Sequence, residues 1–433
     1  MRLSDKIRNH SARVTVIGQG YVGLPLAIEF AKVGFQVTGI DLDEEKVSSL
    51  NKGESYIPDV ESRTVRHLIE DGQYRATTDM SALAESETII ICVPTPLRKS
   101  KDPDISFVMA SANEAKKHLH PGVLVILEST TYPGTTKEVL LPMFEESGLK
   151  VGRDFFLAFS PERIDPGNIQ FKVKDIPKVV GGITSECSWM AALLYGQIVS
   201  RVHEVSSPTV AELAKLYENT FRSVNIALAN EFALMCRHLD TSVWEVIEAA
   251  ATKPFGFMPF SPGPGIGGHC IPIDPIYLSW KLRLTGYEAR FIALADDINR
   301  SMPRYVTDLL IDGLNNREKC LKGANILVLG VAYKRGVGDV RESPAIDVIT
   351  ELQRKGAKVR YADPFVSSLS HEGLDVQRVD ATAEVLRECD AAIILTDHRE
   401  FDYYTIVQQA DLIIDARNAT RGMTVPENKV IRL

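Results

Sequence analysis

The chain has 433 residues, of which 45% are hydrophobic and 24% are charged, and its net charge at pH 7 is −8. Its mean hydropathy is −0.04 and its isoelectric point is near 5.7. This composition excludes a disordered chain and a membrane-embedded one, because no apolar run approaches the roughly 20 residues of a membrane helix. The acidic balance also argues against nucleic acid as a partner, because a phosphate backbone calls for a basic surface.

The start of the chain and its cysteines indicate the environment of the protein. The first residues, Met1 to Arg8, contain no apolar stretch of the kind that a secretory signal has, so a cytoplasmic protein is expected. The six cysteines form no Cys-x-x-Cys pair, which argues against a zinc site and against a disulfide framework. Most of them are expected to be buried small hydrophobes, with Cys270 as the exception.

The first part of the chain alternates apolar strand signals with helical stretches. Strands are predicted at residues 13–17, 35–40, 88–93, 123–127 and 155–159. Continuous apolar strands separated by helices are typical of a parallel sheet that is covered on both faces. We therefore expect residues 1–203 to form one doubly wound α/β domain.

A long helix is predicted at residues 209–239, where apolar side chains recur at helical spacing without a Gly or Pro break. More helical text follows to about residue 302, interrupted by a Gly/Pro-rich stretch at 259–275. A helix that is apolar on more than one face needs partners on several sides, so it could join two domains, form a dimer seam, or both. We expect residues 204–305 to form a helical central domain and the protein to be a homodimer or a larger homo-oligomer.

A second α/β unit is predicted at residues 306–433. Its strands are expected at residues 324–330, 358–364, 391–395 and 412–415, with a helix near 345–355 after the first of them. The expected fold class is therefore α/β, with two Rossmann-like doubly wound domains joined by a helical middle domain that contains a long central helix.

Three glycines after the first strand form a nucleotide-binding pattern. Gly18 permits a tight turn, Gly20 lets the backbone approach a pyrophosphate, and Gly23 lets the following helix pack closely on the strand. That helix presents free N–H groups to the anion at its N-terminus. Asp41 ends the next strand, where its carboxylate accepts ribose hydroxyls and repels a 2′-phosphate, so NAD is favoured over NADP. The alternative is a plain strand–turn–helix. The cofactor-binding residues predicted in this region are Gly18, Gly20, Tyr21, Val22, Gly23, Asp41 and Lys46, the last of which has a solvated helix charge as its alternative interpretation.

Several glycines precede Cys270 in the stretch 263–275. They let the main chain pass close to a ligand and offer N–H donors to its oxygens. A thiol in this position is able to attack an aldehyde carbon. Asp274 lies one helical turn from Cys270 if a helix begins here. A structural cysteine in a tight turn is the competing interpretation, and His269 is interpreted as structural because adjacent residues point apart.

Lys215 and Asn219 lie four positions apart on one face of the predicted long helix. In otherwise apolar surroundings, an ammonium and an amide are able to hold a water or an oxyanion together. Solvated surface residues are the alternative interpretation of this pair.

Polar residues follow three of the predicted strands. Thr95 follows the third strand, residues 128–135 with Thr130 follow the fourth, and Glu162 follows the fifth. Open α/β sheets bind ligands beyond the carboxyl ends of their strands, so these residues are expected to ring one crevice. Glu162 is a candidate acid or base there. Taken singly, each segment is an ordinary turn.

Six sequence blocks occur in an order that is typical of one enzyme family. They are residues 18–23, 128–135, 160–163, 212–219, 263–274 and 331–344. In these blocks the chain resembles the UDP-glucose/GDP-mannose dehydrogenase family, from about residue 12 to near residue 419. The resemblance implies an N-terminal NAD domain, a helical middle that forms a dimer, and a C-terminal Rossmann-like domain that contacts a nucleotide sugar. The implied partners are a UDP-N-acetylhexosamine substrate and a second copy of the chain.

The resemblance also implies roles for individual residues. It makes Cys270 the nucleophile. The groups that hold the oxyanion or a water around it are Lys215, Asn219, Asp274, Glu162 and Thr130. The implied substrate-binding residues are Glu162, Arg163, Lys215, Asn219, Phe255, Gly267 and Lys334. The cofactor-binding residues gain Thr95, Thr130 and Arg341, the last from the third domain.

Within the family, the chain is most similar to the branch that oxidises UDP-N-acetyl-D-glucosamine. The similarity lies in residues 128–135, 160–168 and 254–257. Ile273 stands where UDP-glucose enzymes usually carry a lysine, and their upstream arginine is missing, so plain UDP-glucose is a weaker alternative. UDP-N-acetyl-D-mannosamine is the other alternative. It is less favoured than UDP-N-acetyl-D-glucosamine, because the enzymes of that branch resemble this chain somewhat less in the loop after Glu162.

Oxidation of a primary alcohol to an acid removes four electrons, so two NAD⁺ are consumed per sugar. In the expected mechanism Cys270 adds to the aldehyde to give a thiohemiacetal and then a thioester, which water hydrolyses near Asp274 and Glu162. Covalent capture divides a hard oxidation into two steps and prevents escape of the aldehyde. The product would serve surface polysaccharide or glycan synthesis. Two other classes stay open: a two-electron dehydrogenase of a smaller hydroxy acid, and a non-catalytic nucleotide-sensing module.

Overall fold

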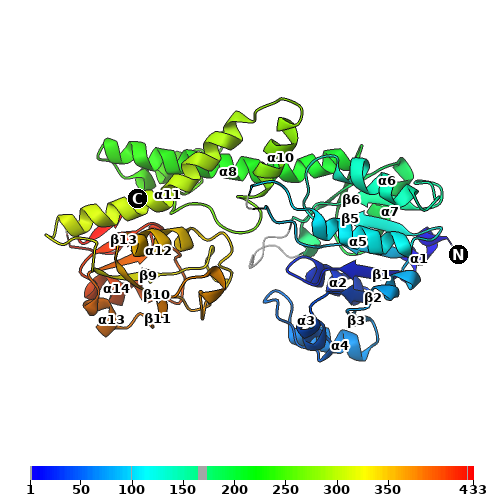
Figure 1. Ribbon diagram of the computed structural model, residues 1–433, viewed down its shortest axis with the longest axis horizontal. Helices are drawn as coiled ribbons and strands as arrows, with labels where there is room; N and C mark the ends of the chain where they lie inside the picture. Colours follow the sequence, from blue (N-terminus) through cyan, green and yellow to red (C-terminus); the bar gives the residue numbers. More distant parts are fainter. Residues whose placement is uncertain (1, 99, 164–172, 427) are drawn as a thin grey trace. The chain divides into compact units, whose positions relative to one another are not determined.

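The computed structural model describes residues 2–98, 100–163, 173–426 and 428–433. The chain divides into two compact units (Figure 1). The first comprises Met1–Glu218 and Trp280–Gly286, and the second comprises Asn219–Ser279 and Tyr287–Leu433. Across the described ranges, no helix combines the length and the apolar character that crossing a membrane requires.

An eight-stranded sheet forms the middle of the first unit, in the order β3-β2-β1-β4-β5-β6-β7-β8. Its strands are β1 (Arg13–Ile17), β2 (Gln36–Ile40), β3 (Tyr74–Thr77), β4 (Thr88–Ile91), β5 (Leu124–Leu127), β6 (Phe156–Phe159), β7 (Lys178–Gly182) and β8 (Val202–Val205). The first six strands are parallel and have the 3-2-1-4-5-6 order of a doubly wound dinucleotide-binding sheet. The sequence analysis predicted five of these six.

Strand β7 departs from the predicted parallel pattern because it pairs antiparallel with β6. A parallel return requires a crossover, usually a helix, whereas an antiparallel return does not. The described residues between β6 and β7 contain no α-helix. The antiparallel pairing therefore brings the first residue of β7, Lys178, to the edge of the sheet at which β6 ends.

Apolar side chains cover both faces of this sheet because they alternate along each strand. On β5, Leu124 and Ile126 join one buried cluster, while Val125 and Leu127 join another. Helices α2, α4 and α7 contribute to the first cluster, and α5 and α6 contribute to the second. The helices of this unit before the long helix are α1 (Leu3–Arg8), α2 (Gly23–Lys32), α3 (Glu44–Asn51), α4 (Ser62–Glu70), α5 (Ser106–Lys117), α6 (Leu141–Glu145) and α7 (Ser185–Tyr195).

The second unit contains a six-stranded parallel sheet in the order β11-β10-β9-β12-β13-β14. Its strands are β9 (Asn325–Leu329), β10 (Lys358–Ala362), β11 (Gln377–Arg378), β12 (Ala391–Ile394), β13 (Ile413–Asp415) and β14 (Val430–Arg432). Helices α11 (Arg290–Asn315) and α12 (Pro344–Arg354) contribute to the apolar cluster on one face, and α13 (Ala383–Glu388) and α14 (Tyr403–Gln409) to the cluster on the other. The strand order repeats that of the first unit, which confirms the predicted fold class.

Long helices separate the two sheets along the chain (Figure 1). Helix α8 (Pro208–His238) matches the predicted helix at 209–239 and continues through the division between the units. Two shorter helices follow, α9 (Val243–Ala251) and α10 (Asp274–Arg283). The prediction that helical structure ends near residue 302 was too short, because α11 continues through Pro303. The residues around it, Met302 and Val306, are fully buried, and their packing outweighs the cost of about 3 kcal/mol for an internal proline.

None of the six cysteines, all of which lie in the described ranges, forms a disulfide. Four of them, Cys92, Cys187, Cys236 and Cys389, are buried as expected, and Cys270 is exposed as expected. The expectation that Cys270 is the exception needs a correction, because Cys320 is exposed too. It lies in the turn that follows α11, where few side chains cover it.

A buried carboxylate on α8 anchors this helix within the first unit. Glu212 is 1% exposed and accepts hydrogen bonds from the N–H of Gly134 at 2.6 Å, the N–H of Thr136 at 2.9 Å and the Thr136 hydroxyl at 2.8 Å. Gly134 has a φ angle of 95°, a conformation that favours glycine. The helix and the loop after β5 are therefore held together by a charged acceptor.

We predict that Glu212→Ala lowers the free energy of unfolding by about 3 kcal/mol, because three buried donors lose a charged partner. Urea unfolding followed by circular dichroism measures the change. Glu85→Ala is the matched control, because Glu85 forms an exposed pair with Arg13 at 2.8 Å, and such pairs contribute about 0 to 1 kcal/mol. Equal effects of the two substitutions would show that Glu212 is not an anchor.

Candidate active site

The glycine turn of the first unit leaves the main chain open where the motif requires it. Gly18 has a φ angle of 92°, and a Cβ atom there would lie 2.4 Å from the carbonyl oxygen of Cys92. A Cβ at Gly23 would lie 1.8 Å from the carbonyl oxygen of Gly18. At Gly20, by contrast, a Cβ would meet no described atom within 4 Å. Two glycines therefore permit tight packing and the third leaves space beside the backbone, an arrangement that fits a dinucleotide.

Asp41 follows β2, and its carboxylate is bonded to the glycine turn. Its Oδ2 accepts a hydrogen bond from the N–H of Gln19 at 2.8 Å, and its Oδ1 accepts one from the N–H of Asp43 at 3.1 Å. Tyr56, which the sequence analysis missed, donates to the carbonyl oxygen of Gln19 at 2.6 Å. Lys46 pairs with Asp43 at 3.6 Å, so a role of Lys46 toward the cofactor stays a prediction.

The other cofactor residues predicted in this unit follow neighbouring strands. Tyr21 is exposed and Val22 precedes α2, both in the turn after β1. Thr95 follows β4 and is buried, and Thr130 follows β5 and is half-buried. Because β1, β4 and β5 are parallel neighbours, their carboxyl ends share one edge of the sheet. The Thr131 hydroxyl is buried and lacks a hydrogen-bond partner among the described residues, which makes it a candidate that the sequence analysis missed.

Glu162 follows β6 at the same edge and is buried beside two other charged side chains. Lys178 contacts Oε2 of Glu162 at 3.2 Å and also donates to Oε1 of Glu128. The Tyr195 hydroxyl donates to Oε2 of Glu128 at 2.5 Å. All four side chains belong to residues that are at most 8% exposed. The sequence analysis did not identify Lys178, because no motif marks it.

Burial and mutual charge set the protonation of this cluster. Burial raises the pKa of Glu128 to about 7, an effect that Lys178 opposes and Glu162 reinforces. Burial would lower the pKa of Lys178, but the two carboxylates raise it above its ordinary value. Burial also raises the pKa of Tyr195 and of the Cys92 thiol. Lys178 is therefore charged at neutral pH, while Glu128 keeps its proton up to a pH well above the ordinary pKa of a glutamate.

Two further cations were predicted for the site in this unit. Arg163 pairs with Glu218 of α8 at 2.7 Å and donates to the carbonyl oxygen of Pro177 at 2.7 Å. Lys215 also lies on α8, is 8% exposed and forms no hydrogen bond or ion pair with the residues that the structure describes. A buried ammonium without a partner is costly, which favours a ligand-binding role for Lys215 over a solvated one. The segment 164–168, used to compare substrate branches, lies outside the described residues.

Cys270 lies in the second unit, where its side chain is exposed. Its carbonyl oxygen accepts hydrogen bonds from the N–H groups of Ile273 at 3.2 Å and Asp274 at 2.8 Å, and α10 begins at Asp274. The helical turn expected between Cys270 and Asp274 is therefore present. Asp274 is 3% exposed, and its Oδ2 accepts a hydrogen bond from Nδ2 of Asn219 at 2.5 Å. Two of the predicted site residues are thus bonded directly, and the thiol lies one turn away.

The glycine stretch packs on the loop that carries Lys334 and Arg341. A Cβ at Gly267 would lie 2.7 Å from the Cβ of Tyr333, and a Cβ at Gly268 would lie 2.8 Å from the Tyr333 ring. The N–H of Gly268 donates to the carbonyl oxygen of Arg341 at 3.2 Å. Because side chains would prevent this approach, the glycines bring two predicted blocks side by side.

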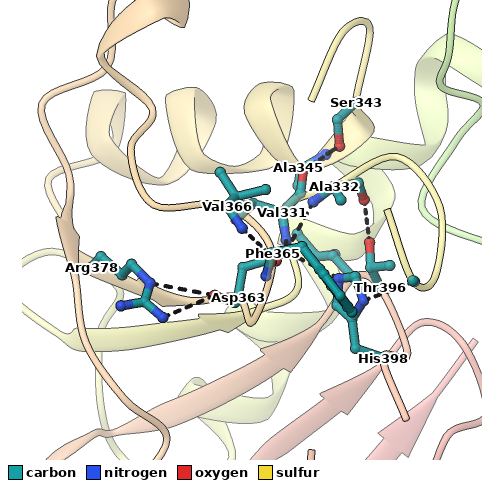
Figure 2. A network of polar contacts seen from close by, with 12 residues as sticks. Val331, Ala332, Ser343, Ala345, Asp363, Phe365, Val366, Arg378, Thr396 and His398 are labelled. Carbon is teal, nitrogen blue, oxygen red and sulfur yellow. Dashed lines mark hydrogen bonds and ion pairs between the residues drawn. The ribbon is translucent and has the colours of Figure 1, made fainter. Parts of the chain in front are cut away.

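A buried network holds the beginning of this loop (Figure 2). Asp363 follows β10 and accepts hydrogen bonds from the N–H groups of Val331 at 2.8 Å and Ala332 at 3.1 Å, and from Nε2 of His398 at 3.1 Å. Burial alone would raise the pKa of Asp363, but the bonds from His398 and the backbone lower it below its ordinary value. Nδ1 of His398 accepts a hydrogen bond from the N–H of Gly336 at 3.1 Å. Asp363 and His398 therefore hold both ends of the segment that contains the predicted lysine.

Two arginines near this loop were missed by the sequence analysis. The Nε of Arg417 donates to the carbonyl oxygen of Leu395 at 2.9 Å, and a Cβ at Gly263 would lie 2.9 Å from an Arg417 guanidinium nitrogen. Burial and the nearby Arg335 lower the pKa of Arg417 to about 10. Arg335 itself forms an ion pair with Asp397, so the positive charge that suits an anion such as a diphosphate rests on Arg417. Arg417 follows the end of β13, so a search for strand-end residues could have found it.

Phe255 and Arg341 are exposed residues of the second unit. The Lys253 ammonium lies 5.0 Å from the centre of the Phe255 ring, and Arg341 pairs with Asp339 at 2.6 Å. Their roles toward substrate and cofactor stay predictions.

Three domains that define one protein family match successive parts of the chain. The NAD binding domain of the UDP-glucose/GDP-mannose dehydrogenase family matches residues 12–199, the central domain matches 209–301, and the UDP binding domain matches 327–422. The chain belongs to this family. It is therefore an NAD-dependent nucleotide-sugar dehydrogenase, and the predicted family and cofactor are confirmed.

Relatives named for two different sugars are similarly close to the chain. It is 37% identical over 412 residues to a UDP-N-acetyl-D-mannosamine dehydrogenase of Pyrococcus horikoshii, covering 94% of this chain and 95% of the relative. It is 37% identical over 358 residues to a UDP-N-acetyl-D-glucosamine 6-dehydrogenase of Pseudomonas aeruginosa, covering 82% and 83%. The solved structure of the UDP-D-ManNAc dehydrogenase from Pyrococcus horikoshii matches with a TM-score of 0.88 and 35% identity, covering 97% of this chain and 98% of that one.

We predict that Glu128→Gln changes how stability depends on pH. The folded-state pKa of Glu128 is about 7, above the ordinary value of 4.5. Its contribution to stability is therefore present below about pH 4.5 and is lost as the pH rises towards 7, because the folded state keeps a proton that the unfolded state releases. Thermal unfolding from about pH 4.5 to 8 should show the original protein losing on the order of 3 kcal/mol relative to the variant. A difference that stays constant with pH would contradict the raised pKa.

Proposed function

We propose that the chain oxidises the C6 alcohol of a UDP-N-acetylhexosamine to the carboxylate, with UDP-N-acetyl-D-glucosamine as the favoured substrate. The observation that carries this proposal is the arrangement around Cys270. Its thiol is exposed, lies one helical turn from the bonded pair of Asn219 and Asp274, and ends a glycine stretch that packs on the loop of Lys334. A two-electron dehydrogenase has no use for such a nucleophile.

The chemistry divides between the cofactor and the side chains. Two NAD⁺, bound one after the other at the glycine turn, would supply the oxidising power for the loss of two hydrides from C6. The Cys270 sulfur forms a bond to C6 of the aldehyde, and the thioester that results from the second oxidation is cleaved when water attacks C6 and the C–S bond breaks. The side chains that we propose to stabilise the negative oxygen in these steps are Lys215 and Asn219, and one well-placed donor contributes on the order of 3 kcal/mol.

The second unit supplies groups that suit the UDP part of the substrate. Lys334 lies in a segment that Asp363 and His398 hold at both ends, and Arg417 adds a positive charge in the same unit. Backbone-held cations bind a diphosphate without first having to be ordered. We propose that Lys334 and Arg417 contact the diphosphate or the sugar.

The C2 configuration of the sugar has two candidates. The sequence features around residues 128–135 and 254–257 favour UDP-N-acetyl-D-glucosamine. UDP-N-acetyl-D-mannosamine is the second candidate, because a relative named for that substrate is as similar to the chain as one named for the glucosamine compound.

We predict that the protein forms NADH with UDP-N-acetyl-D-glucosamine at two NADH per sugar. The assay is absorbance at the NADH band, with the 6-carboxylate identified by mass spectrometry, and UDP-N-acetyl-D-mannosamine, UDP-N-acetyl-D-galactosamine and UDP-glucose are compared in parallel. A higher kcat/KM with the mannosamine compound would reverse the assignment of C2. One NADH per sugar, or none with any UDP-sugar, would remove the proposed function.

We predict that Cys270→Ala lowers formation of the carboxylate by at least about 1000-fold, because the acyl intermediate cannot form. Cys270→Ser should stall as an ester that intact-mass spectrometry detects. Cys320→Ser is the matched control, because Cys320 is the other exposed thiol and should leave turnover unchanged. Acid formation at the original rate in Cys270→Ala would show that another group is the nucleophile.

A further inference from the structure

The antiparallel pairing of β6 and β7 creates a buried ion cluster in the first unit. Ala158 pairs with Gly182 and Phe159 with Gly181, so the same register continued beyond β6 sets Glu162 opposite Lys178. The Lys178 ammonium lies 3.2 Å from Oε2 of Glu162. The contact therefore follows from the strand register, and a parallel β7 would not produce it.

Lys178 is shared between two carboxylates. It also contacts Oε1 of Glu128, which follows β5, the neighbour of β6 on its other side. The side chains of Lys178, Glu128 and Glu162 are 5%, 0% and 10% exposed. One positive charge balances one carboxylate, and a second negative charge in such surroundings is unfavourable. The charge of Glu128 therefore decides how strongly Lys178 stabilises the charge of Glu162.

The other groups around the cluster do not supply the missing positive charge. Tyr195, at the end of α7, donates its hydroxyl to Oε2 of Glu128 at 2.5 Å. Cys92, after β4, interacts electrostatically with the cluster, and burial raises the pKa of its thiol, which keeps it neutral. Arg163 donates its backbone N–H to Oε1 of Glu162 at 2.6 Å, while its guanidinium pairs with Glu218 of α8. Lys178 is thus the cation with which both carboxylates are paired among the described residues.

We infer that Lys178 is a positioning residue that holds Glu162 as an oriented carboxylate for thioester hydrolysis, and that Glu128 adjusts the proton affinity of Glu162 through the shared ammonium. This inference rests on the proposed function and adds to it that Glu162 acts on the hydrolytic water, the role expected from the sequence. In that step the water oxygen forms a bond to C6, the C6–S bond breaks, and Glu162 takes the proton of the water. Contacts that orient Glu162 include the Lys178 ammonium on Oε2 and the Arg163 N–H on Oε1.

Substitutions of Lys178 and of Glu128 are expected to change the pH profile of kcat in opposite directions. Lys178→Met removes the stabilising charge, so the acid limb of the profile should move to higher pH by about 1 to 3 units and kcat should fall. Glu128→Gln keeps the shape of the side chain and is unable to take up the single negative charge that Lys178 balances, so that charge stays on Glu162 and the acid limb should move to lower pH. Lys178→Arg keeps a positive charge and should return the limb toward its original position.

The experiment measures kcat at saturating NAD and UDP-sugar from about pH 5 to 9, with thermal unfolding of each variant in parallel. The matched control is Lys6→Met, which breaks the half-buried pair of Lys6 with Glu87 at 2.6 Å in the same unit. It should leave the limb unmoved. A purely structural role would lower stability and kcat in the variants without moving the limb in opposite directions, and that result would overturn the inference.

Two outcomes separate this inference from the proposed function. If Lys178→Met does not fold, Glu128→Gln decides alone, and a limb that stays in place in that variant removes the role of Glu128 and Lys178. If the unaltered protein forms two NADH per UDP-sugar but neither variant moves the limb, the inference fails and the proposed function stands. If the unaltered protein oxidises no UDP-sugar, the proposed function fails first.

Discussion

Both functional regions of the molecule are held in place by close contacts of the main chain. Only glycine permits these contacts, because a Cβ atom would collide with the neighbouring atoms. In the first unit, Gly23 lies so close to the carbonyl of Gly18 that a Cβ atom would reach to 1.8 Å, and this fixes the start of α2 on the end of β1. In the second unit, a Cβ at Gly267 would lie 2.8 Å from the carbonyl oxygen of Glu342. The stretch before Cys270 is therefore set by backbone packing. Groups presented by such segments are ordered before a ligand binds, which lowers the entropy cost of binding.

Buried and half-buried acidic side chains provide a second level of order, because each is used as an acceptor for main-chain N–H groups at a loop. Glu212 accepts hydrogen bonds from N–H groups of the loop after β5, and Asp41 accepts one from the glycine turn. Asp363 accepts two from the loop that carries the predicted lysine. Hydrogen bonds to charged acceptors are stronger than those to neutral ones. The cluster of Glu128 and Lys178 differs from these three. Its carboxylates bind a side-chain ammonium, so their protonation responds to neighbouring charge and is able to take part in proton transfer.

Sequence patterns predicted the elements whose periodicity is strong and missed features that arise from pairing. The helix at 209–239 and five parallel strands of the first sheet were predicted because apolar spacing identifies them directly. The antiparallel β7 was not, and with it the significance of Lys178, since the register with β6 gives that residue its partner. The spacing of Cys270 and Asp274 in the chain predicted one helical turn between them, and the structure has that turn. Arg417 was not found, because its neighbours come from distant segments and no local motif marks it.

The chemistry at C6 and the choice between C2 epimers depend on different kinds of structure. Asn219 and Asp274 belong to helices α8 and α10, and a hydrogen bond of 2.5 Å joins their side chains. The segment 254–257, on which the sequence analysis based part of its choice of substrate, lies in a turn where Phe255 is 71% exposed. Side chains in turns are free to vary while the helices that carry the chemistry stay constant. Two relatives named for different N-acetyl sugars are each 37% identical to this chain, so overall similarity does not separate the two substrates.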